Sequence, residues 1–451
     1  MKSVNVTDVI DRSRLGAFQV RLFVLCALCL IMDGFDVQVI GFLAPEISRD
    51  WQLTSASLAP VFAAGNFGVL LGAMVFTMAA DTIGRRPVLL ASTYFFAAMM
   101  LVTARASSLE ELIVLRFIAG LGLGSVIPSA TALIGEYSPA RSRIALMMSI
   151  TVGFTAGAAF GGLIAAWMVP RFGWQSVLYF GGIVPLVIAV GMWFWLPESL
   201  QLLVLRGRHD EAKANLTRID PSLDLSDATL VVPERQRGGL PATHLFREGR
   251  ASGTLLLWFV NFMNILLVYS LGSWLPTVVR DAGHSRETAV LVGTILQVGG
   301  TVGTLVFAQL IGRFTFIPVL VSSFVLALVS IASIGPSIPV VALLTTVVFV
   351  AGWCTIGAQP GLNALSATFY PTSLRSTGVG WGLGFGRIGA IVGPIIGGEL
   401  IRRQWSGEQL FFAASIPALL AVAGTVLLGK AIKARSDADA GNTSGSASRR
   451  G

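Results

Sequence analysis

The feature that most constrains this chain is an apolar run that recurs along almost its whole length. The hydrocarbon core of a bilayer is about 30 Å thick, so a helix needs roughly 20 apolar residues to cross it. Twelve such runs occur, and the chain is 54% hydrophobic and 12% charged, with a mean hydropathy of +0.75. The sequence therefore predicts an all-α integral membrane protein with twelve transmembrane helices. The predicted spans cover residues 19–44, 58–80, 87–104, 112–135, 144–169, 176–196, 253–277, 289–311, 315–333, 339–366, 376–400 and 409–430.

The basic residues predict the orientation of the chain. A net charge of +8 could suit a nucleic-acid-binding protein, but most of the 32 Lys and Arg residues lie near the two termini and in alternate loops. Such an excess marks the cytoplasmic side, so both termini are expected in the cytoplasm. The predicted organisation is a cytoplasmic N-terminus at 1–18, an N-terminal six-helix bundle at 19–196, a cytoplasmic central loop at 197–252, a C-terminal six-helix bundle at 253–430 and a disordered cytoplasmic tail at 431–451.

The two groups of six spans repeat each other. Gly153-x3-Gly157-x3-Gly161 in the fifth span recurs as a second ladder, with Gly389 and Gly393, in the eleventh. Small residues every fourth position let helices pack closely. Two six-helix repeats are typical of secondary transporters, whose substrate site lies near the middle of the membrane. No Gly-Lys-Ser/Thr phosphate loop occurs, so we expect an ion gradient rather than ATP to supply the energy.

The loop "AADTIGRRP", between the second and third spans, resembles the loop motif of the major facilitator superfamily, Gly-x3-Asp-Arg-x-Gly-Arg-Arg. Thr77 and Thr82 depart from that motif, and Gln309 replaces the acid in the second half. A carboxylate here can cap a helix N-terminus while the arginines form ion pairs. Simple anchoring by positive charge is the alternative. The candidate cytoplasmic-gate residues are Asp81, Gly84, Arg85, Arg86, Glu136 and Arg375.

Few ionisable residues lie within the spans, and these are functional candidates because their desolvation is costly. Asp33 and Asp36 in "DGFD" share one face of the first span. Two like charges that close cannot both ionise comfortably, so we expect one of them to take up a proton within the working pH range. The pair is therefore the candidate proton-coupling site. The corresponding positions of the second half hold Asn261 and Asn264.

Two arginines complete the set of charges within the membrane. Arg387 lies 12 residues from Arg375, so it is roughly 18 Å along its helix and close to the midplane. Arg116 lies in the fourth span at a depth similar to that of Asp36. Their guanidinium groups suit a substrate carboxylate. The alternative is that both arginines form buried ion pairs with the aspartates and do no more.

Several segments together resemble the aromatic acid:proton symporters of the major facilitator superfamily: "DGFD", "IGRRP", "GEYSPARSR" and "YPTSLRSTGVGWGLGFGRIGAIVGPIIGG". The resemblance covers residues 15–430. It implies proton-driven uptake of an aromatic carboxylate, such as a hydroxybenzoate, across a bacterial inner membrane. The positions that the family would use fall on Asp33, Asp36, Asp81, Gly84, Arg116, Glu136, Arg375 and Arg387.

These observations lead to one hypothesis of mechanism. The aspartate pair takes a proton, the anionic substrate pairs with Arg387, with Arg116 as a second candidate partner, and the two halves then rock to open inward. No cofactor and no metal are expected, the partners are an aromatic acid, protons and lipid, and one chain suffices as a working unit. The weaker candidates for the substrate cavity are Phe35, Asn261, Asn264, Tyr269, Trp353 and Trp381.

Three other functions are alternatives to transport into the cell. A proton-antiport exporter of drugs or metabolites would use the same fold. A membrane sensor of aromatic acids is less consistent with the sequence, because the central loop and the tail offer no output domain. An enzyme is not expected, because no nucleophile, base and orienting group can be assembled, and the three histidines lie in predicted loops.

Overall fold

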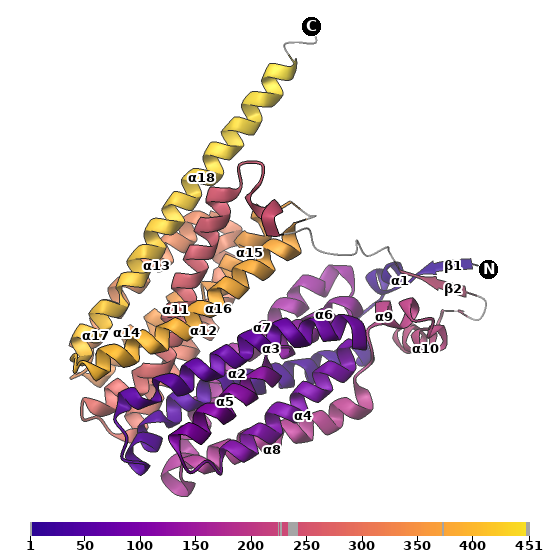
Figure 1. Cartoon of the computed structure of the whole chain (residues 1–451). Coiled ribbons are helices and arrows are strands. Elements are labelled where there is room, and N and C mark those ends of the chain that lie inside the picture. The colour runs from indigo at the N-terminus through magenta and orange to yellow at the C-terminus, as the bar shows by residue number, and fades with distance from the viewer. Residues whose placement is uncertain (1, 224, 226–227, 233–241, 372–373, 448–451) are drawn as a thin grey trace. The chain divides into compact units, whose positions relative to one another are not determined.

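The computed structural model describes residues 2–223, 225, 228–232, 242–371 and 374–447 (Figure 1). The side chains of residues 2, 81, 144, 148, 151, 308, 376 and 435–447 lie outside that description. Within the described chain, 12 helical segments are long and apolar enough to cross a membrane, which confirms the predicted number. In order they are α2 (Ala17–Asp50), η1 and α3 (Ser55–Leu58, Ala59–Ile83), α4 (Arg85–Thr103), α5 and α6 (Leu109–Leu123, Val126–Tyr137), α7 (Ala140–Phe172), α8 (Trp174–Trp195), α11 (Ala251–Asp281), α12 (Arg286–Phe314), α13 (Phe316–Ser337), α14 and α15 (Val341–Thr355, Gln359–Phe369), α16 (Arg375–Arg402), and α17 and α18 (Gly407–Ala414, Ile416–Ala447).

The chain forms two compact units. The first combines Met1–Leu53 with Pro60–Gln236, and the second combines Thr54–Ala59 with Arg237–Gly451. Most of the polar segment at 197–252 therefore packs with the first six spans. Each unit contains one of the two groups of spans that the sequence repeat predicts.

The glycine ladders position the first helix of each unit. In the first unit α7 packs along α2, and a Cβ on Gly157 would lie 1.9 Å from the carbonyl oxygen of Ile31. A Cβ on Gly34 would lie equally close to a backbone oxygen of α7. In the second unit α16 packs along α11, where a Cβ on Gly389 would lie 2.5 Å from the carbonyl oxygen of Phe262. The ladders are therefore close-packing surfaces for the two helices that carry Asp33/Asp36 and Asn261/Asn264.

The fourth and tenth spans are each broken near the middle. α5 and α6 are separated at Gly124–Ser125, and α14 and α15 at Ile356–Ala358. A Cβ on Gly124 would lie 2.1 Å from the backbone nitrogen of Ala73 in α3, and one on Gly357 would lie 2.7 Å from the backbone of α12. Both breaks therefore occur where the absence of a side chain lets a second helix approach the backbone.

The N-terminal residues and part of the central polar segment fold together beside the first unit's helices. A short parallel sheet pairs Lys2 with Ala228 and Asn5 with Val231. Ile10, Leu216 and Leu230 are buried within this small substructure. Its elements are β1 (Lys2–Asn5), α1 (Val6–Arg12), α9 (Leu200–Leu205), α10 (His209–Ile219) and β2 (Ala228–Val231).

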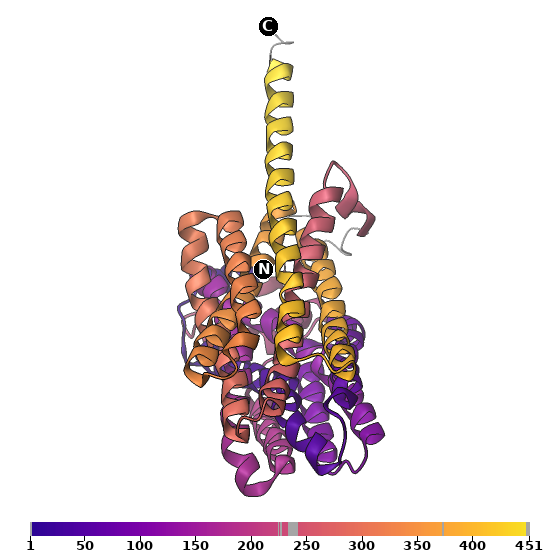
Figure 2. The same ribbon diagram turned by 90° about the vertical axis from the view of Figure 1, so that its left-hand side faces the viewer.

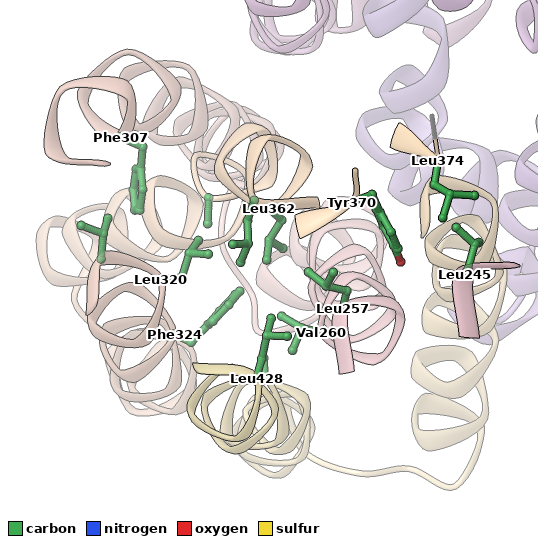
Figure 3. Packing of buried hydrophobic residues seen from close by; sticks show 14 residues of the cluster. Leu245, Leu257, Val260, Phe307, Leu320, Phe324, Leu362, Tyr370, Leu374 and Leu428 are labelled. Carbon is green, nitrogen blue, oxygen red and sulfur yellow. The ribbon is translucent and has the colours of Figure 1, made fainter. Parts of the chain in front are cut away.

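An apolar core holds the second unit together (Figure 3). Phe324 of α13, Leu362 of α15 and Leu428 of α18 all lie in it, and each is at most 2% exposed. A short helix, η2 (Ala242–Phe246), adds Leu245. The core fixes α11, α15 and α18 to one another, so the polar residues that α11 and α15 carry have rigid supports.

α18 extends well past the other helices of its unit (Figures 1 and 2). It continues beyond residue 430, the predicted end of the twelfth span, through residues 431–447 of the segment predicted to be disordered. Each residue added to an existing helix gains a backbone hydrogen bond, so a helix can continue past its apolar part. The structure differs from the sequence prediction over these residues.

Candidate functional site

Asp36 of α2 and Arg116 of α5 form a buried ion pair in the first unit. Arg116 Nη1 donates to Asp36 Oδ1 at 2.6 Å, and Nη2 donates to the Asp36 carbonyl oxygen at 3.1 Å. The Arg116 side chain is 5% exposed and that of Asp36 is 0% exposed. Because two donors of one guanidinium bind the same residue, the geometry of the pair is fixed. In this structure the charge of Arg116 is therefore balanced by Asp36.

The other three residues of "DGFD" lie in different surroundings. Asp33 lies one turn before Asp36 on the same helix and is likewise buried. Gly34 allows α7 to approach. The ring of Phe35 is fully buried and packs against that of Phe180, with the ring centroids 5.8 Å apart. The structure thus makes Phe35 a core side chain rather than a cavity wall, because α7 and α8 enclose it.

Arg387 of α16 differs from Arg116 in its surroundings. Its side chain is partly exposed, and it forms no hydrogen bond or ion pair with any other described residue. Gly384 and Gly380 lie one and two turns earlier on the same face of the helix. A Cβ on either glycine would meet no described atom within 4 Å. The free guanidinium therefore lies beside an open, glycine-lined stretch of helix surface.

Four amide side chains form a hydrogen-bonded network in the second unit. Gln359 Nε2 donates to Asn261 Oδ1 at 2.8 Å and to Asn363 Oδ1 at 3.1 Å. Gln359 Oε1 accepts from Asn264 Nδ2 at 2.8 Å. Asn261 Nδ2 donates to the carbonyl oxygen of Gly382 on α16 at 2.8 Å. The network therefore links α11, α15 and α16, and includes both asparagines that the sequence singled out.

The remaining cavity candidates lie in different surroundings. Trp381 is 52% exposed and stacks on Trp258, with centroids 5.9 Å apart and an interplanar angle of 13°. Trp353 packs against Phe307 at 5.2 Å and lines a separate apolar cavity of about 340 Å³ between α12, α13 and α14. Tyr269 is partly buried on α11. Trp381 and Tyr269 thus lie on the same two helices as Arg387 and the asparagines, whereas Trp353 lies on α14 and lines the apolar cavity.

The loop between α3 and α4 holds the gate candidates. Glu136, the predicted acidic partner, has Oε1 at 2.6 Å from Arg85 Nη1. Arg86 Nη2 donates to the carbonyl oxygen of Trp193 at 2.6 Å. Arg375, at the start of α16 in the second unit, is exposed. The two arginines of the loop therefore have different partners, one an acid on α6 and one a backbone oxygen on α8.

Glu198, which sequence reasoning missed, caps the N-terminus of α4. Its Oε1 accepts from the backbone N–H groups of Arg85 and Arg86 at 2.9 and 3.2 Å. Gly84, with φ +127°, precedes the helix, and a Cβ there would lie 2.3 Å from Glu198 Oε2. The sequence assigned such a capping role to Asp81, whose side chain lies outside the described residues. The acidic residue directly after Pro197 was the available signal.

The sequence matches the model of one known protein family over most of its length. The model of the Major Facilitator Superfamily matches residues 26–345 and 257–448. The chain belongs to the Major Facilitator Superfamily. Its twelve spans in two units are the architecture of that family, and it is a multi-pass membrane transporter rather than an enzyme.

Three similar proteins place this major facilitator among the aromatic acid transporters. The 4-hydroxybenzoate transporter PcaK of Pseudomonas putida is 38% identical over 431 residues, which cover 95% of this chain and 96% of that protein. The protein of the same name from Pseudomonas aeruginosa is 40% identical, with 98% of both chains covered. A gallate transporter of Pseudomonas putida is 37% identical, with 95% of this chain and 96% of that protein covered.

Solved major facilitator structures show the same fold at low sequence identity. A D-xylose-proton symporter superposes with a TM-score of 0.71 at 17% identity, covering 91% of this chain and 97% of the other. A bacterial homolog of the human lysosomal transporter Spinster gives the same score and identity, covering 94% and 99%. These two comparisons support the fold and carry no information on the substrate.

Two members of the amide network also escaped the sequence analysis. Gln359 and Asn363 lie on α15, directly after the break in the tenth span. Ionisable side chains stand out in an apolar run because burying their charge is costly, whereas amides carry no charge. A signal was nevertheless present, because Gln359 and Asn363 are spaced i,i+4 and so share one helical face within an otherwise apolar run of this facilitator.

Proposed function

We propose that the protein is a proton-coupled importer of an aromatic carboxylate that works by alternating access. In this proposal it acts as a monomer in the bacterial inner membrane, with both termini in the cytoplasm. The named activities of its relatives support the substrate class, because 4-hydroxybenzoate and gallate are both ring acids. The distribution of basic residues supports the orientation.

The observation that carries the proposal is the free guanidinium of Arg387. It lies about 18 Å along α16, near the middle of the span. A permanent charge at that depth is costly unless an opposite charge balances it. Arg116 has such a partner in Asp36, whereas Arg387 has none among the described residues. A planar carboxylate on a flat ring would supply the missing charge, and the open face at Gly384 leaves room for the ring.

The charges of the first unit explain why a proton would accompany the acid. Asp33, Asp36 and Arg116 together carry a formal charge of −1 when both acids are ionised. One proton on the aspartate pair makes this group neutral, just as one carboxylate makes Arg387 neutral. A carrier loaded with both therefore holds no net charge at these four side chains. Movement between the two open states is then least costly when the proton and the ring acid are both bound, or when both have been released.

The test is uptake of a panel of labelled ring acids by proteoliposomes with an imposed pH gradient, with and without a protonophore. We expect one acid to accumulate, and the protonophore to abolish its accumulation. Arg387→Gln should reduce uptake at least 100-fold, and Arg313→Gln, which alters an exposed arginine at the end of α12, should leave it unchanged.

Asp33→Asn tests the coupling separately. This change keeps the Asp36–Arg116 pair and removes one protonatable oxygen. We expect exchange of labelled for unlabelled acid to persist while accumulation against a gradient is lost. Normal uptake by Arg387→Gln would refute the assignment of the carboxylate site, and uphill uptake by Asp33→Asn would refute the proton site. Movement of acid only against the proton flow would identify an exporter instead.

A further inference from the structure

We propose that the amide network of Asn261, Asn264, Gln359 and Asn363 recognises a hydroxyl group on the substrate ring. The inference rests on the proposed function, and narrows its substrate class from aromatic carboxylates to hydroxylated ones. It depends on three observations: the depth of the network, the hydrogen-bonding capacity that it leaves unused, and the helix break beside it.

The network and Arg387 lie in one layer of the second unit. The start of α11 and the end of α15 are together, because a Cβ on Gly253 would lie 2.4 Å from the ring of Phe369. α16 begins only a few residues after α15 ends. Counted from these ends at 1.5 Å per residue, Asn261 and Gln359 lie at about 15 Å and Arg387 at about 18 Å. A ring acid bound at Arg387 is therefore at the depth of the amides.

Asn261 ties this layer to the helix that carries Arg387. It donates to the carbonyl oxygen of Gly382, and a Cβ on Gly386 would lie 3.3 Å from its side chain. Gly386 directly precedes Arg387 in the chain. The first amide of the network thus contacts the residue that directly precedes Arg387 on α16.

The unused hydrogen-bonding capacity matches a hydroxyl group. Asn264 is fully buried, and its Oδ1 has no hydrogen-bond partner among the described residues, although its Nδ2 donates both to Gln359 Oε1 and to the Thr355 carbonyl oxygen. Asn363 is half-buried, and its Nδ2 donates to no other described residue. The network therefore offers a free acceptor at Asn264 Oδ1 and a free donor group at Asn363 Nδ2. A phenolic hydroxyl is itself both donor and acceptor, whereas an unsubstituted ring is neither.

The break between α14 and α15 lies beside these groups. The tenth span is interrupted at Ile356–Ala358, between Thr355 and Gln359. Gln359 is a member of the network, and the Thr355 carbonyl oxygen accepts a hydrogen bond from Asn264. Discontinuous helices with polar groups near the midplane are typical of substrate sites in secondary transporters. α15 begins at Gln359, directly after the interruption, and the Gln359 side chain is directed to α11. The interruption therefore places the Gln359 side chain and the Thr355 carbonyl oxygen together at the network.

The test compares the affinities of wild type and variants for 4-hydroxybenzoate and benzoate, measured by competition for binding to the purified protein. We expect wild type to prefer the hydroxylated acid about tenfold or more, since a site built to hydrogen-bond a hydroxyl leaves its groups unpaired with the analogue. Asn264→Ala and Asn363→Ala should lower this ratio by up to about tenfold while benzoate binding is retained. Asn66→Ala removes an amide that, among the described residues, bonds only to a backbone oxygen of its own helix, and it should leave the ratio unchanged.

Each outcome decides the inference. A lower ratio with benzoate binding retained supports it. An unchanged ratio in Asn363→Ala, whose half-buried site is the easier one to alter without unfolding, overturns it. A parallel loss of both acids also overturns it, because the network would then be only structural. If wild type binds no ring acid at all, the proposed function itself has failed, and this result is distinguishable because no ratio can be measured.

Discussion

Replacement of Asp36 by Asn should destabilise the protein severely, before any effect on proton coupling is considered. Asp36 and Arg116 are almost completely buried, and Arg116 Nη1 lies 2.6 Å from Asp36 Oδ1. Asn retains an oxygen that can accept a hydrogen bond, but it removes the negative charge that lies 2.6 Å from the guanidinium. Two unit charges about 4 Å apart interact by about 4 kcal/mol at an effective dielectric constant of 20. Removal of one partner of a buried pair typically costs about 3–5 kcal/mol, so we expect a loss in that range.

A double-mutant cycle separates the pair from the individual side chains. Arg116→Met and Asp36→Leu, each made alone, should also destabilise the protein, because each leaves one buried charge without its partner. The double variant Asp36→Leu with Arg116→Met replaces both charges by apolar groups, and such replacements are often neutral or stabilising. We therefore expect the double variant to be more stable than either single variant, with a coupling energy of about 3 kcal/mol.

The three cysteines provide the assay. Cys26, Cys29 and Cys354 are free thiols that are buried in the folded protein. A thiol-reactive fluorophore should label them only on unfolding, so a thermal scan of the purified protein in detergent reports stability directly. Glu399→Gln, which alters an exposed ion pair with Arg402, is the control and should shift the midpoint little. If Asp36→Asn melts no earlier than this control, Asp36 and Arg116 are not a buried pair, and the reasoning fails.

Two further predictions concern packing and capping. Gly157→Ala should prevent folding or lower the melting temperature strongly, since its Cβ would lie 1.9 Å from a backbone oxygen, whereas Gly312→Ala, whose Cβ would meet no described atom within 4 Å, should behave as wild type in the same thermal scan. Glu198→Ala should destabilise the protein by about 1–3 kcal/mol, because it removes the acceptor for two backbone N–H groups at the start of α4. Glu198→Gln should cost less, and equal stability of Glu198→Ala and wild type would show that the cap contributes nothing.

Much of the fold could be predicted because its causes are local. A run of about 20 apolar residues crosses a bilayer wherever the rest of the chain lies. The glycine ladders likewise predict close helix packing without their partners being known. The sequence could not predict the sheet that pairs Lys2 with Ala228, since this pairing joins residues far apart and only four residues on each strand take part. Nor could it predict how far α18 continues, because continuation depends on backbone hydrogen bonds rather than on an apolar pattern.

The candidate residues could be picked out from the sequence, whereas the partners of their side chains could not. Charged residues within spans stand out in a sequence because each one costs free energy, which identified Asp36, Arg116 and Arg387. Their partners do not stand out, so the sequence named Arg387 as the first candidate for the substrate carboxylate and Arg116 as the second, with buried ion pairs to the aspartates as the alternative for both. The geometry separates them, since one has a carboxylate at 2.6 Å and the other has no partner among the described residues.

Duplication offers a reason for this division of labour. The first helix of each unit carries two polar residues three apart, at corresponding positions: Asp33 and Asp36 in α2, and Asn261 and Asn264 in α11. In the first unit they are acids. Together with Arg116 they carry a formal charge of −1, which one proton would neutralise. In the other they are amides, which cannot bind a proton but can read a neutral substituent through directed hydrogen bonds. If the proton and the ring acid bind at these two places, the two copies of one ancestral helix have come to carry the driving ion and the cargo, and a variant that damages one need not damage recognition of the other.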